Sequence, residues 1–154
     1  MPNRRDTISM DEEEAWKFIE SQKTVQVSSI NKDGSPHLVP MWFFVSDKKI
    51  ILVSYTKSQK IRNLRRNPKI AILFEDGEEY ESLRGVSINA DASLVDDADE
   101  VQSMEKKLIT RNQAGQQAAD VEEIIRKSRS KKTAIVITPA RIISWDHRKL
   151  DVSY

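Results

Sequence analysis

The residues best suited to chemistry lie in one short basic segment that ends at Lys69. Six basic side chains and no acidic one fall between Lys57 and Lys69, whereas the whole chain of 154 residues has a formal net charge of only +1. Ser58 and Lys60 follow an apolar run, IILVSY, at the point where a helix should begin. Free backbone N–H groups and the helix dipole favour an anion at such a junction. With a further hydroxyl from Thr56, this donor set predicts a terminal phosphate monoester as the ligand.

The three arginines of the same segment leave two interpretations open. Arg62, Arg65 and Arg66 are spaced so that they spread around a helix. They either extend the anion site toward a ligand with several negative charges or form an ordinary solvated face. The near-neutral net charge and the lack of aromatic residues between these bases disfavour nucleic acid as a partner.

Residue types that other chemistries need are missing or badly placed. The chain has no cysteine, which excludes disulfides, thiol nucleophiles and cysteine metal sites. His37 and His147 are the only histidines, and no carboxylates flank them at ligand spacing, so no metal site is expected. Asp146, His147 and Arg148 resemble a charged catalytic cluster, but no serine is placed as a nucleophile. We therefore assign no catalytic side chain from the sequence.

Length and composition suit one domain over residues 1–154. Charged residues make up 32% of the chain and hydrophobic residues 38%, as in globular proteins. No apolar run approaches the roughly 20 residues that span a bilayer, so no membrane segment is expected. The first ten residues, MPNRRDTISM, lack the apolar core of a secretory signal. We therefore expect a cytoplasmic protein.

Hydrophobic periodicity and the residues typical of caps and turns predict the elements that position the basic segment. A capping-box pattern runs from Ser9 to Glu12, so a helix over 10–21 is expected to begin there. The basic segment forms a short helix that ends before Pro68, because the residue before proline resists helical geometry. Residues 36–45 are apolar on both faces, as in a strand covered on both sides. Further strands are expected over 24–30, 49–55, 70–74, 86–94, 133–138 and 141–145, and further helices over 96–111 and around 121–125.

These elements predict a fold class. Six or seven strands at short spacing, with helices inserted rather than alternating, do not make a doubly wound fold. They predict a mainly β protein with accessory helices, built as an antiparallel barrel.

The order of these motifs resembles the FMN-binding split-barrel family, which includes pyridoxamine 5'-phosphate oxidases and the flavin/deazaflavin oxidoreductases. The resemblance covers residues 10–147, and its most specific part is the S-x-K-x-x-N-L-x-x-N-P run from Ser58 to Pro68. The stretches 75–86 and 144–150 are similar to motifs of the coenzyme F-420 branch. The resemblance implies a Greek-key-like antiparallel split β-barrel.

The same resemblance implies a cofactor site in the basic segment. Ser58 and Lys60 would bind the cofactor phosphate. Thr56 and Lys57 would flank the phosphate, and Asn63 would support that loop.

The resemblance also implies a ring site and a partner. The family places its cofactor at the interface of a homodimer, so Trp145 and Arg148 are expected to reach the site from the other subunit. The backbone of one strand segment would meet the polar edge of the planar ring. That segment consists of Val39, Pro40, Met41 and Trp42, and it ends at Phe43.

One departure from the pattern bears on the cofactor. Pyridoxamine oxidases carry an arginine and a lysine in the second-strand motif, whereas residues 37–42 here contain neither. Vitamin B6 oxidation is therefore not expected. Coenzyme F-420 carries a phosphate and an acidic glutamate tail, which suits six bases between Lys57 and Lys69. We therefore expect an oxidoreductase that uses F-420 on a small unsaturated or conjugated substrate, with FMN as the alternative cofactor and a flavin or haem carrier as the alternative function.

Overall fold

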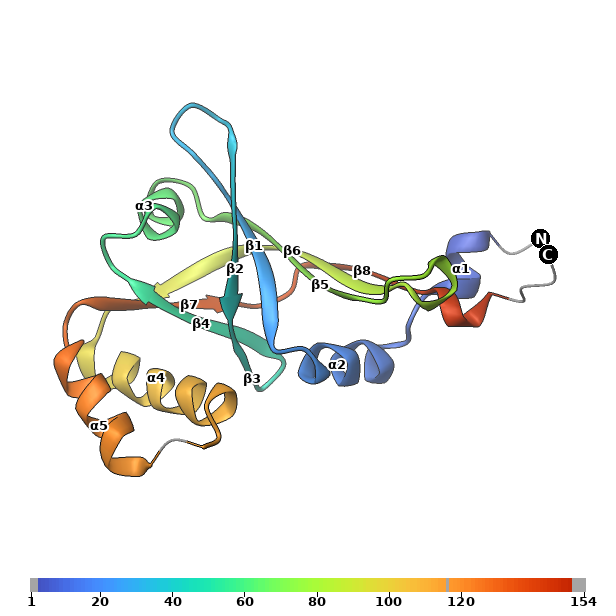
Figure 1. Ribbon diagram of the computed structural model, residues 1–154. Helices are drawn as coiled ribbons and strands as arrows, with labels where there is room; N and C mark the ends of the chain where they lie inside the picture. Colours follow the sequence, from blue (N-terminus) through green and yellow to red (C-terminus); the bar gives the residue numbers. More distant parts are fainter. Residues whose placement is uncertain (1–2, 116, 151–154) are drawn as a thin grey trace.

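A curled antiparallel sheet with helices on its flanks makes up the computed structural model, which describes residues 3–115 and 117–150 (Figure 1). The strands are β1 (Thr24–Ile30), β2 (Pro36–Trp42), β3 (Phe44–Ser46), β4 (Lys49–Tyr55), β5 (Lys69–Asp76), β6 (Arg84–Val95), β7 (Lys132–Ile137) and β8 (Arg141–Asp146). The helices are α1 (Arg4–Ile8), α2 (Glu12–Ser21), α3 (Gln59–Arg66), α4 (Ala98–Asn112) and α5 (Ala118–Lys127), with short 3-10 turns η1 (Tyr80–Ser82) and η2 (His147–Lys149).

The strand order is β2-β1-β5-β6-β7-β4-β3, and β8 pairs with β6 outside this path. Every strand pair is antiparallel. The long strand β6 joins the two parts of the sheet, because residues 84–89 pair with β8 and residues 92–95 pair with β7. This topology confirms the predicted antiparallel split barrel with accessory helices.

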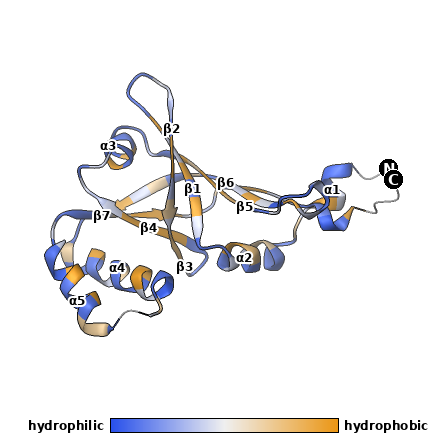
Figure 2. Ribbon diagram, in the orientation of Figure 1, coloured by the Kyte–Doolittle hydropathy of each residue, from blue (hydrophilic) through white to orange (hydrophobic). Residues whose placement is uncertain are grey.

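Strand β4 lies between two apolar cores. Its Ile50 and Leu52 are fully buried in the main core inside the curled sheet. Its Ile51 and Val53 instead pack with Leu108 of α4 in a second cluster. Figure 2 shows this contrast, with apolar colour along β4 and β7 and polar colour over much of α3. A strand covered on both faces explains the continuous apolar run IILV before the basic segment.

The prediction of one doubly covered strand over 36–45 is wrong. The chain crosses from one part of the sheet to the other at Phe43, so β2 pairs with β1 and β3 pairs with β4. Phe43 is fully buried against Phe74, with ring centroids 4.9 Å apart. Strand β2 lies at the end of the strand order, and its Leu38 and Trp42 are 65% and 40% exposed.

The predicted start of α2 is also wrong by two residues. Its capping box uses Asp11, whose side chain accepts from the Glu14 N–H at 2.8 Å. The backbone N–H of Met10 donates instead to Ser144 Oγ of β8 at 2.9 Å, so this tertiary contact holds the chain just ahead of the cap. The short helix α1 was not predicted, since residues 4–8 contribute no buried residue and show no apolar period.

Strands β5, β6 and β8 extend beyond the barrel as an arm that ends at α1 and η2 (Figure 1). The end of the arm is held by polar contacts: Lys149 binds Glu14 at 2.7 Å, and the His147 N–H donates to the Leu83 carbonyl at 2.9 Å. None of the described helices has the length and apolar character needed to cross a membrane.

Candidate cofactor site

The turn from β4 into α3 places a serine at the start of a helix. Ser58 occupies the N-cap position, but its side chain makes no capping hydrogen bond. Its hydroxyl lies 3.1 Å from Ser54 Oγ, and its N–H donates to the Tyr55 carbonyl at 2.9 Å. The first N–H groups of α3 therefore lack a side-chain acceptor, which leaves them available to an anion.

Lys60 brings a positive charge to the same place. Its ammonium donates to Ser54 Oγ at 3.1 Å, and burial lowers the pKa of Lys60. Among the described residues, no carboxylate lies within ion-pair distance of this half-buried ammonium. A charge held next to neutral hydroxyls and a helix N-terminus is a donor set that fits a phosphate monoester.

Thr56 and Asn63 support this junction. The Thr56 hydroxyl lies 2.8 Å from Thr133 Oγ1 of β7, so it is engaged within the chain. Asn63 is fully buried, and its side-chain amide donates to Ser29 Oγ at 3.1 Å and to Asn31 Oδ1 at 2.9 Å. These contacts fasten α3 to β1 and to the turn that follows it.

Three bases of the segment have partners within the chain. Arg65 binds both oxygens of Asp96, at 2.5 and 3.0 Å, which lowers the pKa of Asp96. Lys69 pairs with Asp91 at 2.8 Å. Arg66 donates to the Ile30 carbonyl at 2.7 Å.

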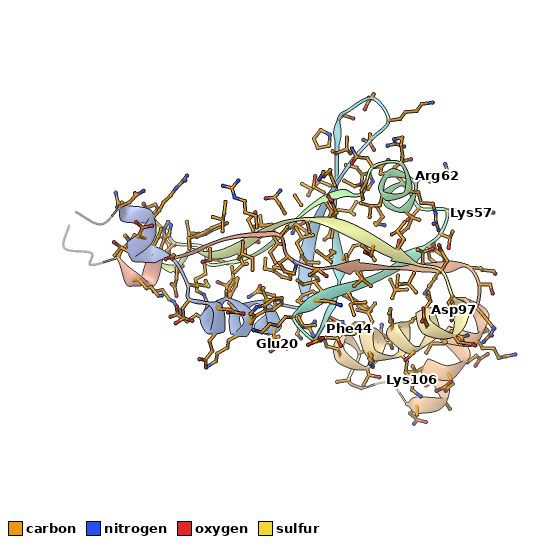
Figure 3. All side chains as sticks on the ribbon, turned by 180° about the vertical axis from the view of Figure 1, so that it is seen from behind. Glu20, Phe44, Lys57, Arg62, Asp97 and Lys106 are labelled. Atoms are coloured by element: carbon orange, nitrogen blue, oxygen red, sulfur yellow. The ribbon has the colours of Figure 1, made fainter. Side chains whose placement is uncertain are left out.

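The other exposed bases remain without a counter-charge. Lys57 and Arg62 are both exposed, and no ion pair is recorded for either within the described ranges. Figure 3 shows them at the same end of the molecule, near α3. With Lys60 and Arg66, whose acceptors are the neutral Ile30 carbonyl and Asn63 Oδ1, they form the part of the basic segment that no described carboxylate neutralises.

The predicted ring segment is the edge strand of the sheet. Within the described part of the chain, β2 pairs only with β1, so backbone groups along its other edge are open. Pro40 and Trp42 are exposed, whereas Val39 and Met41 are half-buried, and Met41 packs against the main core. An open strand edge with an exposed aromatic can border a planar ligand.

A long side chain from α4 fixes the corner after this strand. Arg111 donates to the Phe43 carbonyl at 2.9 Å and to the Gln22 carbonyl at 2.6 Å. Its guanidinium lies 4.4 Å from the centre of the Phe43 ring. Burial lowers the pKa of Arg111, and these contacts hold the end of β2 next to α4.

Trp145 and Arg148 are not brought to Ser58 and Lys60 within one chain. They lie at the far end of the arm, whereas α3 lies beside the barrel (Figure 1). Trp145 packs so closely over Gly85 that a Cβ at Gly85 would lie 2.1 Å from its ring. Arg148 binds Asp146 of its own turn, at 2.9 and 2.7 Å.

The sequence analysis missed polar residues that belong to this region. Ser54 receives the Lys60 ammonium, yet it stands inside an apolar run and gives no motif signal. The available clue was the two-residue period of strand β4, which places Ser54 on the same face as Leu52. Glu105 and Lys132 form an ion pair beside Trp42 and were also missed, since 27 positions separate them in the chain.

Comparison with known proteins identifies the family. The family described as pyridoxamine 5'-phosphate oxidase matches residues 11–146. The chain belongs to this family. Members of this family bind flavins and include oxidoreductases. No functionally curated protein matches the chain in sequence.

Several solved structures share the fold of this chain. A conserved hypothetical protein from Mycobacterium tuberculosis is 35% identical, with a TM-score of 0.88 over 99% of this chain and 95% of that chain. A protein described as an F420 reductase is 20% identical, with a TM-score of 0.64 over 92% of this chain and 98% of that chain. The haem storage protein of Vibrio cholerae is 16% identical, with a TM-score of 0.67 over 86% and 94%.

Proposed function

We propose that this chain is an oxidoreductase that binds coenzyme F-420 through Ser58 and Lys60 and delivers hydride to a small unsaturated or conjugated organic molecule. The observation that carries the proposal is the half-buried Lys60 ammonium beside the open N-terminus of α3. Among the described residues, its one hydrogen-bond partner is the Ser54 hydroxyl at 3.1 Å. A buried charge without a counter-charge is costly, so this arrangement supports an anionic ligand as its partner.

The side chains of this site bind and orient rather than react. Ser58 and Lys60 would hold the phosphate, and the open edge of β2 would border the ring. When bound, the deazaflavin supplies the hydride, while the protein supplies position and electrostatics. This division is consistent with a site in which no side chain is assigned as a nucleophile.

The unneutralised bases favour F-420 over FMN. FMN has one phosphate, which Ser58 and Lys60 could hold alone. F-420 continues into a tail with several carboxylates, and Lys57 and Arg62 offer exposed charges without a carboxylate partner in the described structure. A protein of this fold is described as an F420 reductase, and β2 lacks the basic residues of a vitamin B6 oxidase. FMN stays the alternative cofactor because the family binds flavins.

A second copy of the chain is part of this proposal. Leu38 and Trp42 of β2 are exposed, as are Ile142 and Ile143 of β8 at 42% and 41%. Exposed apolar strands at two places in one sheet favour a two-fold dimer that covers them. Such a dimer could bring Trp145 and Arg148 to the cofactor of the partner. Light scattering should give the mass of a dimer at micromolar concentration, and a stable monomer that still binds cofactor would refute this part.

Titration with F-420, FMN and haem, followed by absorbance and calorimetry, tests the cofactor assignment. Lys60→Ala should weaken F-420 binding by about 2 kcal/mol, or roughly 30-fold, because a charge-assisted hydrogen bond is lost. Ser58→Ala should act in the same direction. Lys69→Ala is the matched control, since that base already pairs with Asp91. Unchanged affinity in both site variants would remove the assignment, and tighter binding of haem would favour the carrier function.

A further inference from the structure

A cleft of about 300 Å³ lies between the edge strand β2 and the helix pair α4–α5. Its lining is mostly apolar and includes Trp42 of β2, Val53 of β4, Leu108 of α4 and Ile124 of α5. Trp42 and Ile124 are 40% and 38% exposed, so apolar surface is accessible there. This volume is at the small end of ligand sites and suits a molecule of one or two fused rings.

An ion pair and the polar Gln113 interrupt the apolar lining. Lys132 of β7 donates to Glu105 of α4, and both residues line the cleft. The Glu105 side chain is only 4% exposed, and the Lys132 side chain is 17% exposed. Ser128 also donates to Glu105, at 3.1 Å, so the carboxylate is held from two sides.

Lys132 retains donors for a ligand. An ammonium has three N–H donors, and Glu105 is the one hydrogen-bond acceptor recorded for Lys132 in the described structure. The ammonium also lies 5.1 Å from the centre of the Tyr55 ring, which stabilises its charge without using a donor. Two of its N–H groups therefore have no acceptor in the described structure, and Lys132 lines the cleft.

A second ion pair, at the surface between α4 and α5, differs from the Lys132–Glu105 pair in its exposure. Lys106 of α4 pairs with Glu122 of α5 at 2.6 Å, with side chains 57% and 60% exposed. Figure 3 shows Lys106 beside these two helices. Such a surface pair links two helices without desolvating either charge. The Lys132–Glu105 pair, by contrast, desolvates two charges beside an open apolar cleft.

We infer that this cleft binds a planar conjugated carbonyl compound, with its ring against Trp42 and the apolar lining and its carbonyl oxygen accepting a hydrogen bond from Lys132. The inference rests on the proposed function and deepens it, because it names the class of the hydride acceptor. The cleft shares Met41 and Trp42 with the strand that is proposed to border the cofactor ring. An acceptor in the cleft would therefore lie next to that ring.

Binding of menadione and 2-methylnaphthalene, measured by equilibrium dialysis without cofactor, tests the inference. The two probes share a methylated naphthalene skeleton, and only menadione has carbonyl oxygens. The double variant Lys132→Met, Glu105→Gln removes both charges together, so no unpaired charge is left buried. It should lower menadione affinity about tenfold, as expected for one charge-assisted hydrogen bond, and leave 2-methylnaphthalene affinity unchanged. Trp42→Ala should lower the affinity for both probes.

The matched control is Lys106→Met, Glu122→Gln, which removes the exposed pair and should change neither affinity. Three outcomes would overturn the inference: no saturable menadione binding to the native chain, menadione binding by the Lys132 double variant within twofold of native, or an equal loss for both probes. Lys60→Ala separates the two proposals, because it should weaken F-420 binding and leave menadione binding intact. If F-420 binding is absent but menadione still depends on Lys132, the cleft stands and the cofactor assignment fails.

Discussion

Positive side chains at the two ends of the molecule differ in their partners. At the start of α3, the Lys60 ammonium meets a neutral hydroxyl, and burial lowers its pKa. At the end of the arm, Arg148 binds both oxygens of Asp146, and Lys149 binds Glu14 at 2.7 Å. Hydrogen bonds from Arg148 lower the pKa of Asp146, which is only 5% exposed.

This difference distinguishes a structural charge from a ligand-binding charge. At the arm, removing one partner of a pair raises the free energy of the folded chain, because the other charge is left buried and unpaired. An unpaired, half-buried ammonium raises that free energy until an anion arrives. Removing a charge should therefore lower stability at the arm, whereas at α3 it should raise stability and weaken anion binding.

The largest effect is expected at the arm. Arg148→Met leaves the buried Asp146 carboxylate without its charged partner and should lower the free energy of unfolding by about 2 kcal/mol. Denaturant unfolding at neutral pH measures this loss. Arg129→Met is the matched control, because its partner Asp99 is 81% exposed and the pair should contribute under about 0.5 kcal/mol. Equal effects from the two variants would contradict the structural role of Arg148.

The stability that the Arg148–Asp146 pair contributes should depend on pH. The folded-state pKa of Asp146 is depressed below its usual value of 3.8, so its contribution to stability is present above that pH. The contribution is lost as pH falls through the folded-state pKa. Acid unfolding of the native chain should therefore be steeper than that of Arg148→Met. Parallel curves would indicate that the pair does not stabilise the fold.

A smaller effect of opposite sign is expected at Lys60. Lys60→Met removes a half-buried ammonium and should raise the free energy of unfolding of the cofactor-free chain by about 0.5 kcal/mol, while weakening F-420 binding. Because the folded-state pKa of Lys60 lies below its usual 10.5, this gain should be present at neutral pH and vanish above that value. Lys69→Met, whose base pairs with Asp91 at the surface, is the control and should give no gain. A destabilised Lys60→Met would argue for a purely structural lysine.

The smallest effect concerns the salt dependence of cofactor affinity. Lys57→Gln with Arg62→Gln should weaken F-420 binding only a few-fold at low salt and flatten its salt dependence, because exposed charges act over a screening length of roughly 8–10 Å. FMN binding should change little. Lys106→Gln with Lys107→Gln removes the same charge from α4 and serves as the control. Wild-type salt dependence in the first variant would identify Lys57 and Arg62 as an ordinary solvated face.

Local patterns predicted many of the elements well. Strands 24–30 and 49–55 have the predicted bounds, and α3 ends before Pro68 as expected. These features depend on neighbours in the chain: alternation, turn residues and the steric effect of proline. The errors occurred where a distant contact decided the outcome. Phe43 breaks the run 36–45 because it packs against Phe74, and Met10 precedes the α2 cap because it binds Ser144.

The candidate site also has features that the local sequence predicts and features that depend on distant contacts. The sequence by itself determined that a serine and a lysine stand at the junction of a strand and a helix, since Ser58 and Lys60 lie two positions apart in one local motif. Only the tertiary structure decided which charges remain free: Asp96 neutralises Arg65 from 31 positions away, and Asp91 neutralises Lys69. It also brought Lys132 to Glu105 beside Trp42. Charge neutralisation depends on distance in space, and a one-dimensional pattern carries no information about that distance once the chain has folded back on itself.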